Sequence, residues 1–251
     1  MTAPRTTGIV IPTYNGLPLL RACVEAVRRH TDPERTPYEL LIVDNGSTDG
    51  TAQWCGSERI SFIRLPANIG FPRACNKGLR LAGGERLLLL NNDVTVTPRW
   101  LDNLSAALDG DDNVGMAGPM TNYASGKQQM DVPHADSAEF ERIADEHNRS
   151  DPGKWEPVMR LVGFCMLFKR EVYERVGELD ERFSPGHYED DDYCLRMRML
   201  GYGLRLCRDT LVHHAGSASF RQVEPGKLQA LVERNRRLFM EKWNVDPAAF
   251  F

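Results

Sequence analysis

Residues 8–50 read GIVIPTYNGLPLLRACVEAVRRHTDPERTPYELLIVDNGSTDG, and this stretch decides the fold class. It contains a short apolar run at 8–14, apolar residues with helical spacing at 17–30, and a second apolar run at 38–44 that ends in a turn sequence. Two strands joined by a helix form a βαβ unit, in which the strands lie parallel. The stretch therefore predicts an α/β protein built on a parallel sheet.

The same alternation continues toward the middle of the chain. The apolar pattern predicts, in order, a strand at 60–65, a helix at 71–82, a strand at 86–93, a helix at 98–108 and a strand at 113–119. Nearly continuous apolar strands are typical of a sheet that helices cover on both faces. We therefore predict a mostly parallel central sheet flanked by helices.

The second half has a less regular pattern. Residues 120–157 are polar and interrupted by Pro and Gly, and we predict a long surface insertion with one short helix that Asp136 caps. Beyond it the pattern predicts a strand at 159–170, a helix at 170–177, a helix that runs from four acidic residues to near Gly201, one or two short strands at 203–216, and a C-terminal helix. Because neither a repeat nor a linker separates these parts, we expect one domain over residues 1–251.

The composition narrows the class of protein. The formal net charge of −4 gives no electrostatic argument for a nucleic-acid partner. The six cysteines are scattered without a C-x-x-C pair, which favours reduced thiols over a zinc site or a disulfide framework. The N-terminus also lacks the apolar stretch of a signal peptide, so we expect a cytoplasmic protein. Arg234, Arg236 and Arg237 are interpreted as a solvated helix face, with contact to a membrane surface as the alternative.

Polar residues follow three of the predicted strands, at the point where each strand ends. They occupy positions 13–15, 44–47 and 91–93. A turn alone explains each segment, since Asn, Asp and Gly favour turns for local reasons. The carboxyl ends of parallel strands meet at one edge of a sheet, however, and ligands of open parallel sheets bind there. The three segments together therefore indicate one ligand crevice.

The residue types point to a cation rather than to a phosphate-binding loop. The chain has neither G-x-G-x-x-G after the first strand nor a P-loop motif, which weakens dinucleotide and P-loop interpretations. Asp93, the acidic row at 189–192 and the histidines at 213–214 instead suggest a divalent cation bound by oxygen and imidazole. Such a cation can neutralise a diphosphate without a phosphate-cradling loop.

The acidic row at 189–192 stands directly before a predicted helix. Acids in a first helical turn complement the helix dipole, and each contributes roughly 0.3–1 kcal/mol at the surface. One or two acids are enough for that purpose, so the alternative is that some of these carboxylates hold a metal, a proton or a hydroxyl.

Eight segments in order resemble family 2 glycosyltransferases of the GT-A fold, over nearly the whole chain. They are IVIPTYNG (9–16), LLIVDNGSTDGT (40–51), NIGFPRACNKGL (68–79), LLLLNNDV (87–94), LVGFCMLFKREVYERVGELDERF (161–183), YEDDDYCLRMRMLGY (188–202), LVHHAGSAS (211–219) and RNRRLFMEKWN (234–244). The N-N-D that stands where the family carries D-x-D is similar to that of rhamnosyltransferase-like members.

The resemblance implies a donor and a division of labour along the chain. It implies transfer, with inversion, of a sugar from a UDP-, dTDP- or GDP-linked donor. It assigns nucleotide-sugar binding to residues 1–118 and acceptor binding and catalysis to residues 158–251. The nucleotide-side residues that it implies are Pro12, Tyr14, Asn15, Asp44, Asn68, Arg73, Asn91 and Asn92.

The resemblance also implies a metal site and a catalytic base. Asp93 and His213 would bind Mg²⁺ or Mn²⁺, while His214 is expected to pack or to form a hydrogen bond. A base takes the proton of the acceptor on one side of the sugar, and the nucleoside diphosphate leaves on the other side. The implied catalytic residues are Asp190 as the base, Glu189 as an acceptor contact and Asp192 as the second acidic position. Asp191 is expected to be a structural acid that is either solvated or complements the helix dipole.

Two other functions remain as alternatives. Asn91 replaces the first carboxylate of D-x-D, which supports a catalytically inactive module that binds sugar nucleotides. A nucleotidyltransferase is the second alternative, but it usually needs a phosphate loop rich in Gly, Lys and Arg, which PTYNGLPLL (12–20) does not resemble. The sequence does not indicate the donor sugar, the nucleotide base, the acceptor or the oligomeric state.

Overall fold

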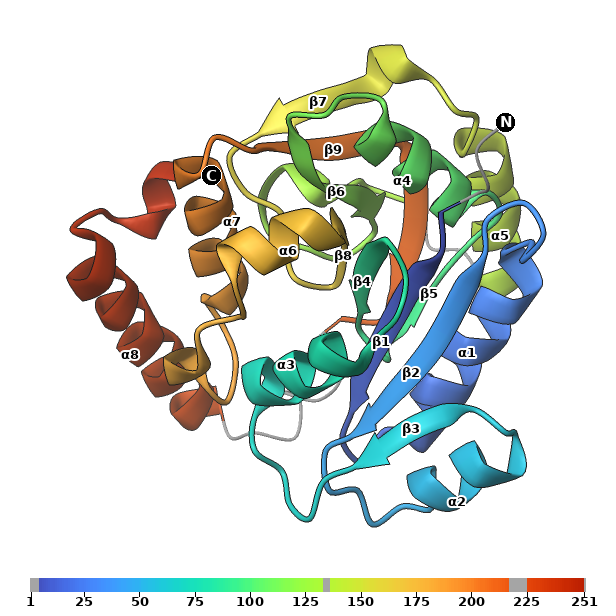
Figure 1. Ribbon diagram of the computed structural model, residues 1–251, viewed down its shortest axis with the longest axis horizontal. Helices are drawn as coiled ribbons and strands as arrows, with labels where there is room; N and C mark the ends of the chain where they lie inside the picture. Colours follow the sequence, from blue (N-terminus) through green and yellow to red (C-terminus); the bar gives the residue numbers. More distant parts are fainter. Residues whose placement is uncertain (1–4, 133–135, 217–224, 251) are drawn as a thin grey trace.

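The computed structural model describes residues 5–132, 136–216 and 225–250. Within these ranges nine strands form one sheet, namely β1 (Thr7–Thr13), β2 (Tyr38–Asp44), β3 (Ser61–Arg64), β4 (Arg86–Leu90), β5 (Val94–Thr95), β6 (Val114–Thr121), β7 (Trp155–Val158), β8 (Cys165–Lys169) and β9 (Gly203–His214). The strand order is β3-β2-β1-β4-β8-β6-β9-β5, and β7 pairs with β9 (Figure 1). The strands from β3 to β4 lie parallel, whereas β8 is antiparallel to both β4 and β6. The parallel sheet predicted for the first half is therefore confirmed, and the sheet becomes mixed beyond it.

Helices cover both faces of this sheet. They are α1 (Leu17–His30), α2 (Thr51–Ser57), α3 (Phe71–Leu81), α4 (Trp100–Asp109), α5 (Ser137–His147), α6 (Arg170–Val176), α7 (Glu189–Met199) and α8 (Pro225–Trp243). Side chains alternate between the two faces of a strand. Accordingly, Ile9 of β1 joins a core cluster with residues of α1 and α4, and Val10 joins a second cluster with residues of α3, α6 and α7.

Helix α1 shows how the sequence produces these layers. Pro18 lies in the first turn, where its missing N–H removes no helical hydrogen bond. Leu20, Cys23, Val24 and Val27 are buried, as their helical spacing predicts. Full burial of each Leu or Val side chain contributes about 1.5–3 kcal/mol, so this face fixes the helix against β1.

Residues 120–157 differ from the long insertion that the sequence predicts. The predicted short helix is present as α5, and the Asp136 side chain caps it by accepting a hydrogen bond from the Glu139 amide at 2.9 Å. However, α5 contacts β9, and β7 pairs antiparallel with β9. These polar residues therefore belong to the body of the fold, because a strand at the edge of a sheet tolerates a polar sequence.

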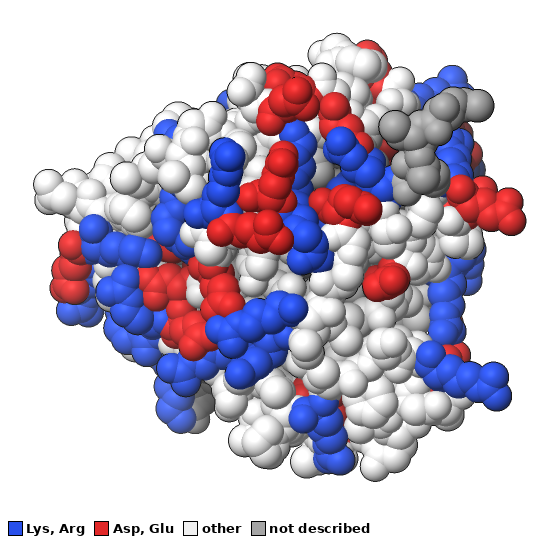
Figure 2. Space-filling model, viewed as in Figure 1, with Lys and Arg blue, Asp and Glu red and all other residues white. Residues whose placement is uncertain are grey.

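The C-terminal helix packs at the α7 end of the molecule (Figure 1). Figure 2 shows that basic and acidic side chains are interspersed over this end. Arg236 and Arg237 lie within 3.5 Å of the carboxylates of Asp246 and Glu233, respectively. Among the helices in the described part of the chain, none is long and apolar enough to cross a membrane.

Candidate active site

A cleft of about 870 Å³ opens at the carboxyl ends of β1 and β4. Its walls come from the ends of these strands, the loop that follows β6, the loop that precedes β8, the start of α7 and the end of β9. Pockets of this size hold small-molecule ligands in other proteins. The predicted meeting of polar strand ends in one crevice is therefore present in the structure.

The structure places five of the eight predicted nucleotide-side residues on the wall of the cleft. These are Pro12, Tyr14, Asn68, Asn91 and Asn92. Asn92 is held in place because its Nδ2 donates to Thr13 Oγ1 at 2.8 Å. The side-chain oxygen of Asn91 is buried without a hydrogen-bond donor among the described residues.

The other three predicted nucleotide-side residues are not among the described residues that line the cleft. Asn15 joins the ends of β1 and β2, since its Oδ1 accepts a hydrogen bond from the Thr48 amide at 2.8 Å. Arg73 is half-exposed on α3, with its Nε 3.5 Å from Glu181 Oε2. Asp44 is fully buried at the end of β2, behind the cleft residue Asn45.

Asp44 has one carboxylate oxygen engaged and one unsatisfied. Its Oδ1 accepts a hydrogen bond from the Ser47 amide at 2.8 Å. Its Oδ2 lies 3.7 Å from Nε of Arg64 and receives no hydrogen bond from any described residue. A buried carboxylate oxygen in this condition is costly unless a further donor reaches it.

Asp93 and His214 meet at the end of the cleft. Nε2 of His214 lies 3.2 Å from Oδ1 of Asp93, and both residues line the cleft. Nδ1 of His214 lies 2.8 Å from the carbonyl oxygen of Tyr123, which only accepts hydrogen bonds, so Nδ1 carries the proton. In the neutral ring, Nε2 therefore presents a lone pair toward a carboxylate. A proton or a cation between Nε2 and Oδ1 would relieve the repulsion between the lone pair and the carboxylate.

This arrangement reverses the sequence-based assignment of the two histidines. His213 is absent from the described residues of the cleft wall, and its ring packs edge-on against Phe140 with centroids 4.9 Å apart. Burial lowers the pKa of His213, and the neighbouring His214 acts in the same direction. Adjacent residues of a strand point to opposite faces, so only one of the two histidines in β9 can face Asp93.

The Asp93–His214 pair fits a divalent cation as a partial ligand set. Within the described ranges, no group of three or more His, Cys, Asp or Glu side chains is placed to hold a metal ion. Two adjacent ligands of an octahedral Mg²⁺ ion, each about 2.1 Å from it, lie about 3 Å apart. The observed separation of 3.2 Å matches that value. The described residues thus offer two ligands at this point, and a bound phosphate would have to supply others.

The first two acids of the row line the cleft, as predicted. Oδ2 of Asp190 accepts a hydrogen bond from the Gly163 amide at 2.9 Å. Glu189 is buried beside it, and its Oε2 has no hydrogen-bond partner among the described residues. Burial, and then the charge of Asp190, raise the pKa of Glu189 well above its ordinary value. Glu189 is therefore suited to remain protonated beside an ionised neighbour.

Asp191 is not the solvated acid that the sequence predicts. It lines the cleft, is 4% exposed and forms an ion pair with Arg160. Burial and the charge of Asp190 raise the pKa of Asp191 to about 7, although Arg160 acts in the opposite direction.

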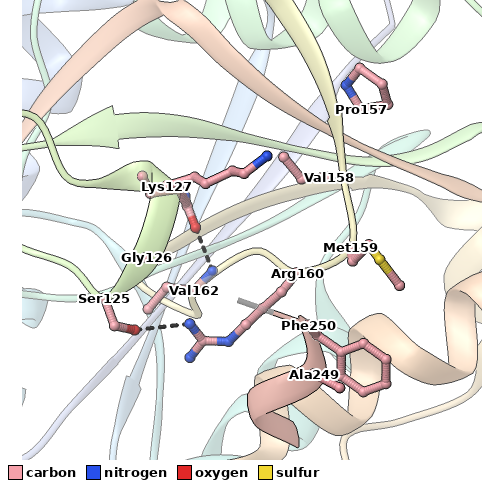
Figure 3. A pocket seen from close by; sticks show the side chains of 11 residues that line it. Ser125, Gly126, Lys127, Pro157, Val158, Met159, Arg160, Val162, Ala249 and Phe250 are labelled. Carbon is pink, nitrogen blue, oxygen red and sulfur yellow. Dashed lines mark hydrogen bonds between the residues drawn. The ribbon is translucent and has the colours of Figure 1, made fainter.

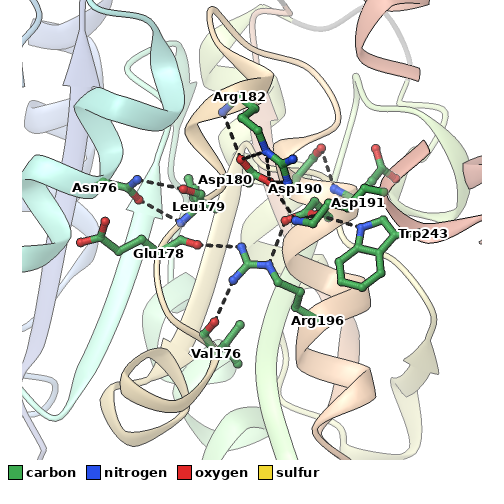
Figure 4. Close-up of polar contacts among 12 residues, drawn as sticks. Asn76, Val176, Glu178, Leu179, Asp180, Arg182, Asp190, Asp191, Arg196 and Trp243 are labelled. Carbon is green, nitrogen blue, oxygen red and sulfur yellow. Dashed lines mark hydrogen bonds and ion pairs between the residues drawn. The ribbon is translucent and has the colours of Figure 1, made fainter. Parts of the chain in front are cut away.

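Of the four acids in the row, Asp192 is the one held in a buried network with α7 and α8. It is fully buried and is not one of the described residues of the cleft wall. Its carboxylate pairs with Arg196 of α7 at 2.9 Å and with Lys242 of α8, and it accepts a hydrogen bond from Trp243 Nε1 at 2.8 Å. Figure 4 shows Arg196 and Trp243 of this network near Asp190 and Asp191. Successive residues of a helix point about 100° apart, so Asp192 faces α8 while Asp190 faces the cleft.

A smaller cavity of about 150 Å³ adjoins the cleft. The two cavities share Ser125, Arg160 and Val162. Figure 3 shows Arg160 among the residues of the smaller cavity, with its Nη1 donating to Ser125 Oγ at 2.9 Å. Arg160 and its partner Asp191 therefore form a charged wall between the two spaces.

Sequence reasoning assigned no role to Tyr123, Arg160 and Gly163, which line the cleft. Gly163 lies within the segment LVGFC, where a glycine directly before a buried strand was an available signal. Arg160 and Tyr123 had no local signal, since they reach the cleft only through the path of their loops.

The comparisons with known proteins agree with this geometry. The model of the family described as Glycosyl transferase family 2 matches residues 8–177. The uncharacterized protein y4gI of Sinorhizobium fredii is 27% identical and covers 96% of this chain, but the chain spans only 28% of its length. The N-acetylglucosaminyl-diphospho-decaprenol L-rhamnosyltransferase of Mycobacterium tuberculosis is 27% identical over 92% of this chain and 83% of its own length.

A solved structure shows the same architecture. The mannosyltransferase PcManGT from Pyrobaculum calidifontis, in complex with GDP-Man and Mn²⁺, is similar with a TM-score of 0.62. It shares 22% sequence identity and covers 85% of this chain, which spans 58% of that protein. This likeness confirms the predicted GT-A fold. With the family model matched over most of the first 177 residues, the chain belongs to glycosyl transferase family 2.

Proposed function

We propose that this protein transfers a sugar, with inversion, from a nucleoside-diphosphate donor to an acceptor hydroxyl. The observation that carries the proposal is the presence of two different groups of polar side chains in one cleft. The Asp93–His214 pair lies at the ends of β4 and β9, and the carboxylate Asp190 lies at the start of α7. Inverting displacement needs both a stabilised leaving group and a base that activates the acceptor.

The polar strand ends would hold the donor. Tyr14, Asn68, Asn91 and Asn92 line the side of the cleft formed by the N-terminal half. Asp44 would receive a hydrogen bond from the base or ribose through its unsatisfied Oδ2, after a small opening of the loop that contains Asn45. The Mn²⁺ and GDP-Man in PcManGT support a diphosphate donor, and UDP-, dTDP- and GDP-sugars all remain candidates.

Asp93 and His214 would hold Mg²⁺ or Mn²⁺ together with the diphosphate oxygens. Mg²⁺ sites are commonly built from one or two carboxylates and substrate phosphates, so a two-residue ligand set is sufficient. The cation would neutralise the charge that develops on the leaving diphosphate.

Asp190 would act as the base. The Gly163 amide fixes one of its oxygens, and the carboxylate remains on the cleft wall. Glu189, which a raised pKa keeps protonated, would donate a hydrogen bond to the acceptor or the sugar. The relative named as an L-rhamnosyltransferase supports a hexosyl or deoxyhexosyl donor. All six cysteines are buried as free thiols, which supports placement in a reducing compartment such as the cytoplasm.

A donor screen tests the proposal. Purified protein is incubated with UDP-, dTDP- and GDP-sugars, Mn²⁺ and a mixture of acceptors, and nucleoside diphosphate and glycosylated product are measured. We expect product with inverted anomeric configuration by NMR. Binding of sugar nucleotides without hydrolysis or transfer would instead indicate an inactive binding module. Formation of nucleoside triphosphate and sugar 1-phosphate, when inorganic pyrophosphate is added to the sugar nucleotides, would indicate a nucleotidyltransferase.

A further inference from the structure

The segment directly before α7 has a conformation that few side chains adopt. His187 has φ 74° and Tyr188 has φ 71°, and Gly186 precedes them. The left-handed region is unfavourable for residues with a Cβ and persists only where the surroundings hold it. Both side chains line the cleft, and Tyr188 is the residue on which α7 begins.

One side chain of α8 contacts this turn in an unusual way. Asn235 is fully buried, and its Nδ2 donates to the carbonyl oxygens of Phe183 at 2.8 Å, Gly186 at 2.8 Å and His187 at 2.9 Å. A single amide group with two N–H donors thus serves three carbonyls of one turn.

Arg234 fixes the direction of that amide. Its Nε and Nη2 donate to Oδ1 of Asn235 at 2.9 and 2.7 Å. The same guanidinium also donates to the carbonyl oxygen of Ser184. Since Oδ1 is occupied by donors, the Nδ2 side must face the turn.

We propose that Asn235, oriented by Arg234, is a positioning residue that holds the left-handed turn at 186–188 and thereby places the acidic row. The turn fixes the start of α7, because the Tyr188 carbonyl accepts the Asp192 amide at 3.0 Å and so closes the first helical turn around Asp190. A change in the turn moves Asp190 relative to the donor. The catalytic part of this inference rests on the proposed function, whereas the structural part does not.

The attachment of α8 to the rest of the protein does not depend on Asn235 alone. Lys242 and Trp243 bind Asp192 from the other end of the helix, and Phe239 is fully buried between these sites. Removing the amide should therefore loosen the turn while α8 stays in place.

Three variants test the inference. Asn235→Ala removes the donors, and Arg234→Ala removes the group that orients them, from an exposed position on the helix. Arg237→Ala is the matched control, because this exposed arginine of the same helix pairs with Glu233 of that helix. Hydrogen–deuterium exchange of peptides over 183–192 and of a remote peptide over 7–30 is measured, together with kcat and the donor KM.

We expect faster exchange at 183–192 in Asn235→Ala and Arg234→Ala, with unchanged exchange at 7–30. The kcat should fall by about ten- to a hundredfold in Asn235→Ala and by less in Arg234→Ala, because small misplacement of a catalytic group has effects of that size. The donor KM should stay within about threefold of wild type, since the donor-side residues lie on other strands. Arg237→Ala should match wild type in every measurement.

Equal exchange at 183–192 in wild type and both variants would overturn the inference, as would equal effects of Arg234→Ala and Arg237→Ala. Faster exchange with an unchanged kcat would overturn the positioning role alone. If Asn235→Ala does not fold, the two arginine variants decide the outcome. If the wild-type protein transfers no sugar, the proposed function fails, while the exchange data still decide whether Asn235 holds the turn.

Discussion

Nε2 of His214 faces Oδ1 of Asp93 at 3.2 Å, while Nδ1 of the same ring is tied to the backbone of Tyr123. The backbone contact fixes the tautomer, so the nitrogen that faces the cleft is the one able to bind a cation. His213, one residue earlier in β9, packs against Phe140 instead. The two adjacent histidines therefore have separable roles.

This relationship predicts how the cation affects nucleotide binding. In the wild-type protein, Mn²⁺ or Mg²⁺ should strengthen the binding of a nucleoside diphosphate. Asp93→Ala and His214→Ala should each lose most of that enhancement, because each removes a ligand, whereas His213→Ala should keep it. Isothermal titration calorimetry with and without the metal measures the effect. Loss of the enhancement in His213→Ala, with retention in His214→Ala, would restore the assignment made from the sequence.

The acidic row predicts different phenotypes for substitutions of Asp190 and Asp192. Asp190→Asn should keep the fold and the donor affinity, while single-turnover transfer falls by about two to four orders of magnitude, as expected for a lost general base. Asp192→Asn should lower the melting temperature, because Lys242 and Arg196 lose their shared buried carboxylate, at a cost of about 3–5 kcal/mol. Normal transfer by Asp190→Asn would show that another group takes the proton.

Gly163 predicts a test of the placement of Asp190. A Cβ at this position would lie 3.3 Å from Cβ of Asp190, which is tighter than most contacts of a Cβ atom, and 3.5 Å from its Oδ2, which is ordinary van der Waals contact. Gly163→Ala should therefore displace the carboxylate and lower kcat by about tenfold or more, with a small change in melting temperature. Gly56→Ala is the control, since a Cβ there meets nothing within 4 Å. Equal activity of the two variants would argue against a tight Gly163–Asp190 contact.

Asp191 predicts how stability depends on pH. Its pKa rises from 3.8 to about 7 in the folded protein, so between these values the folded state binds a proton that the unfolded state has lost. The free energy of unfolding should therefore fall as pH rises through this window, by up to about 1.4 kcal/mol per pH unit for one proton. Asp191→Asn should flatten this dependence in denaturant titrations at pH 4.5, 5.5 and 6.5. Parallel curves for wild type and variant would contradict the raised pKa. We also expect transfer by Asp191→Asn to stay within several-fold of wild type.

The sequence predicted the first half of the fold well because its signals are local. The strand at 38–44 and the helix at 17–30 have the predicted bounds, since a buried strand and an amphipathic helix are visible in the apolar pattern itself. Within residues 120–157 the helix capped by Asp136 was predicted, but β7 was not, because β7 is stabilised by hydrogen bonds to β9, a strand about 50 residues away, rather than by its own composition.

The site shows the same division between local and long-range information. The residue types and the strand ends were predicted, but the side of β9 that faces the cleft was not, because a one-residue shift exchanges His213 and His214. The burial of Asp191 and the partners of Asp192 were not predicted for a related reason. They depend on Arg160 and on α8, and neither is visible from the row itself.

The contacts between Asp192 and α8 also determine how far this fold can be shortened or rearranged. The family model ends at residue 177, before the acidic row, His214 and α8. A polypeptide trimmed to that matched block would lose both Asp190 and His214. One cut after β9 would keep them, but Asp192 would lose Lys242 and Trp243, and the turn at 186–188 would lose Asn235. Grafting or circular permutation of this fold should therefore treat α8 as an integral part of the cleft.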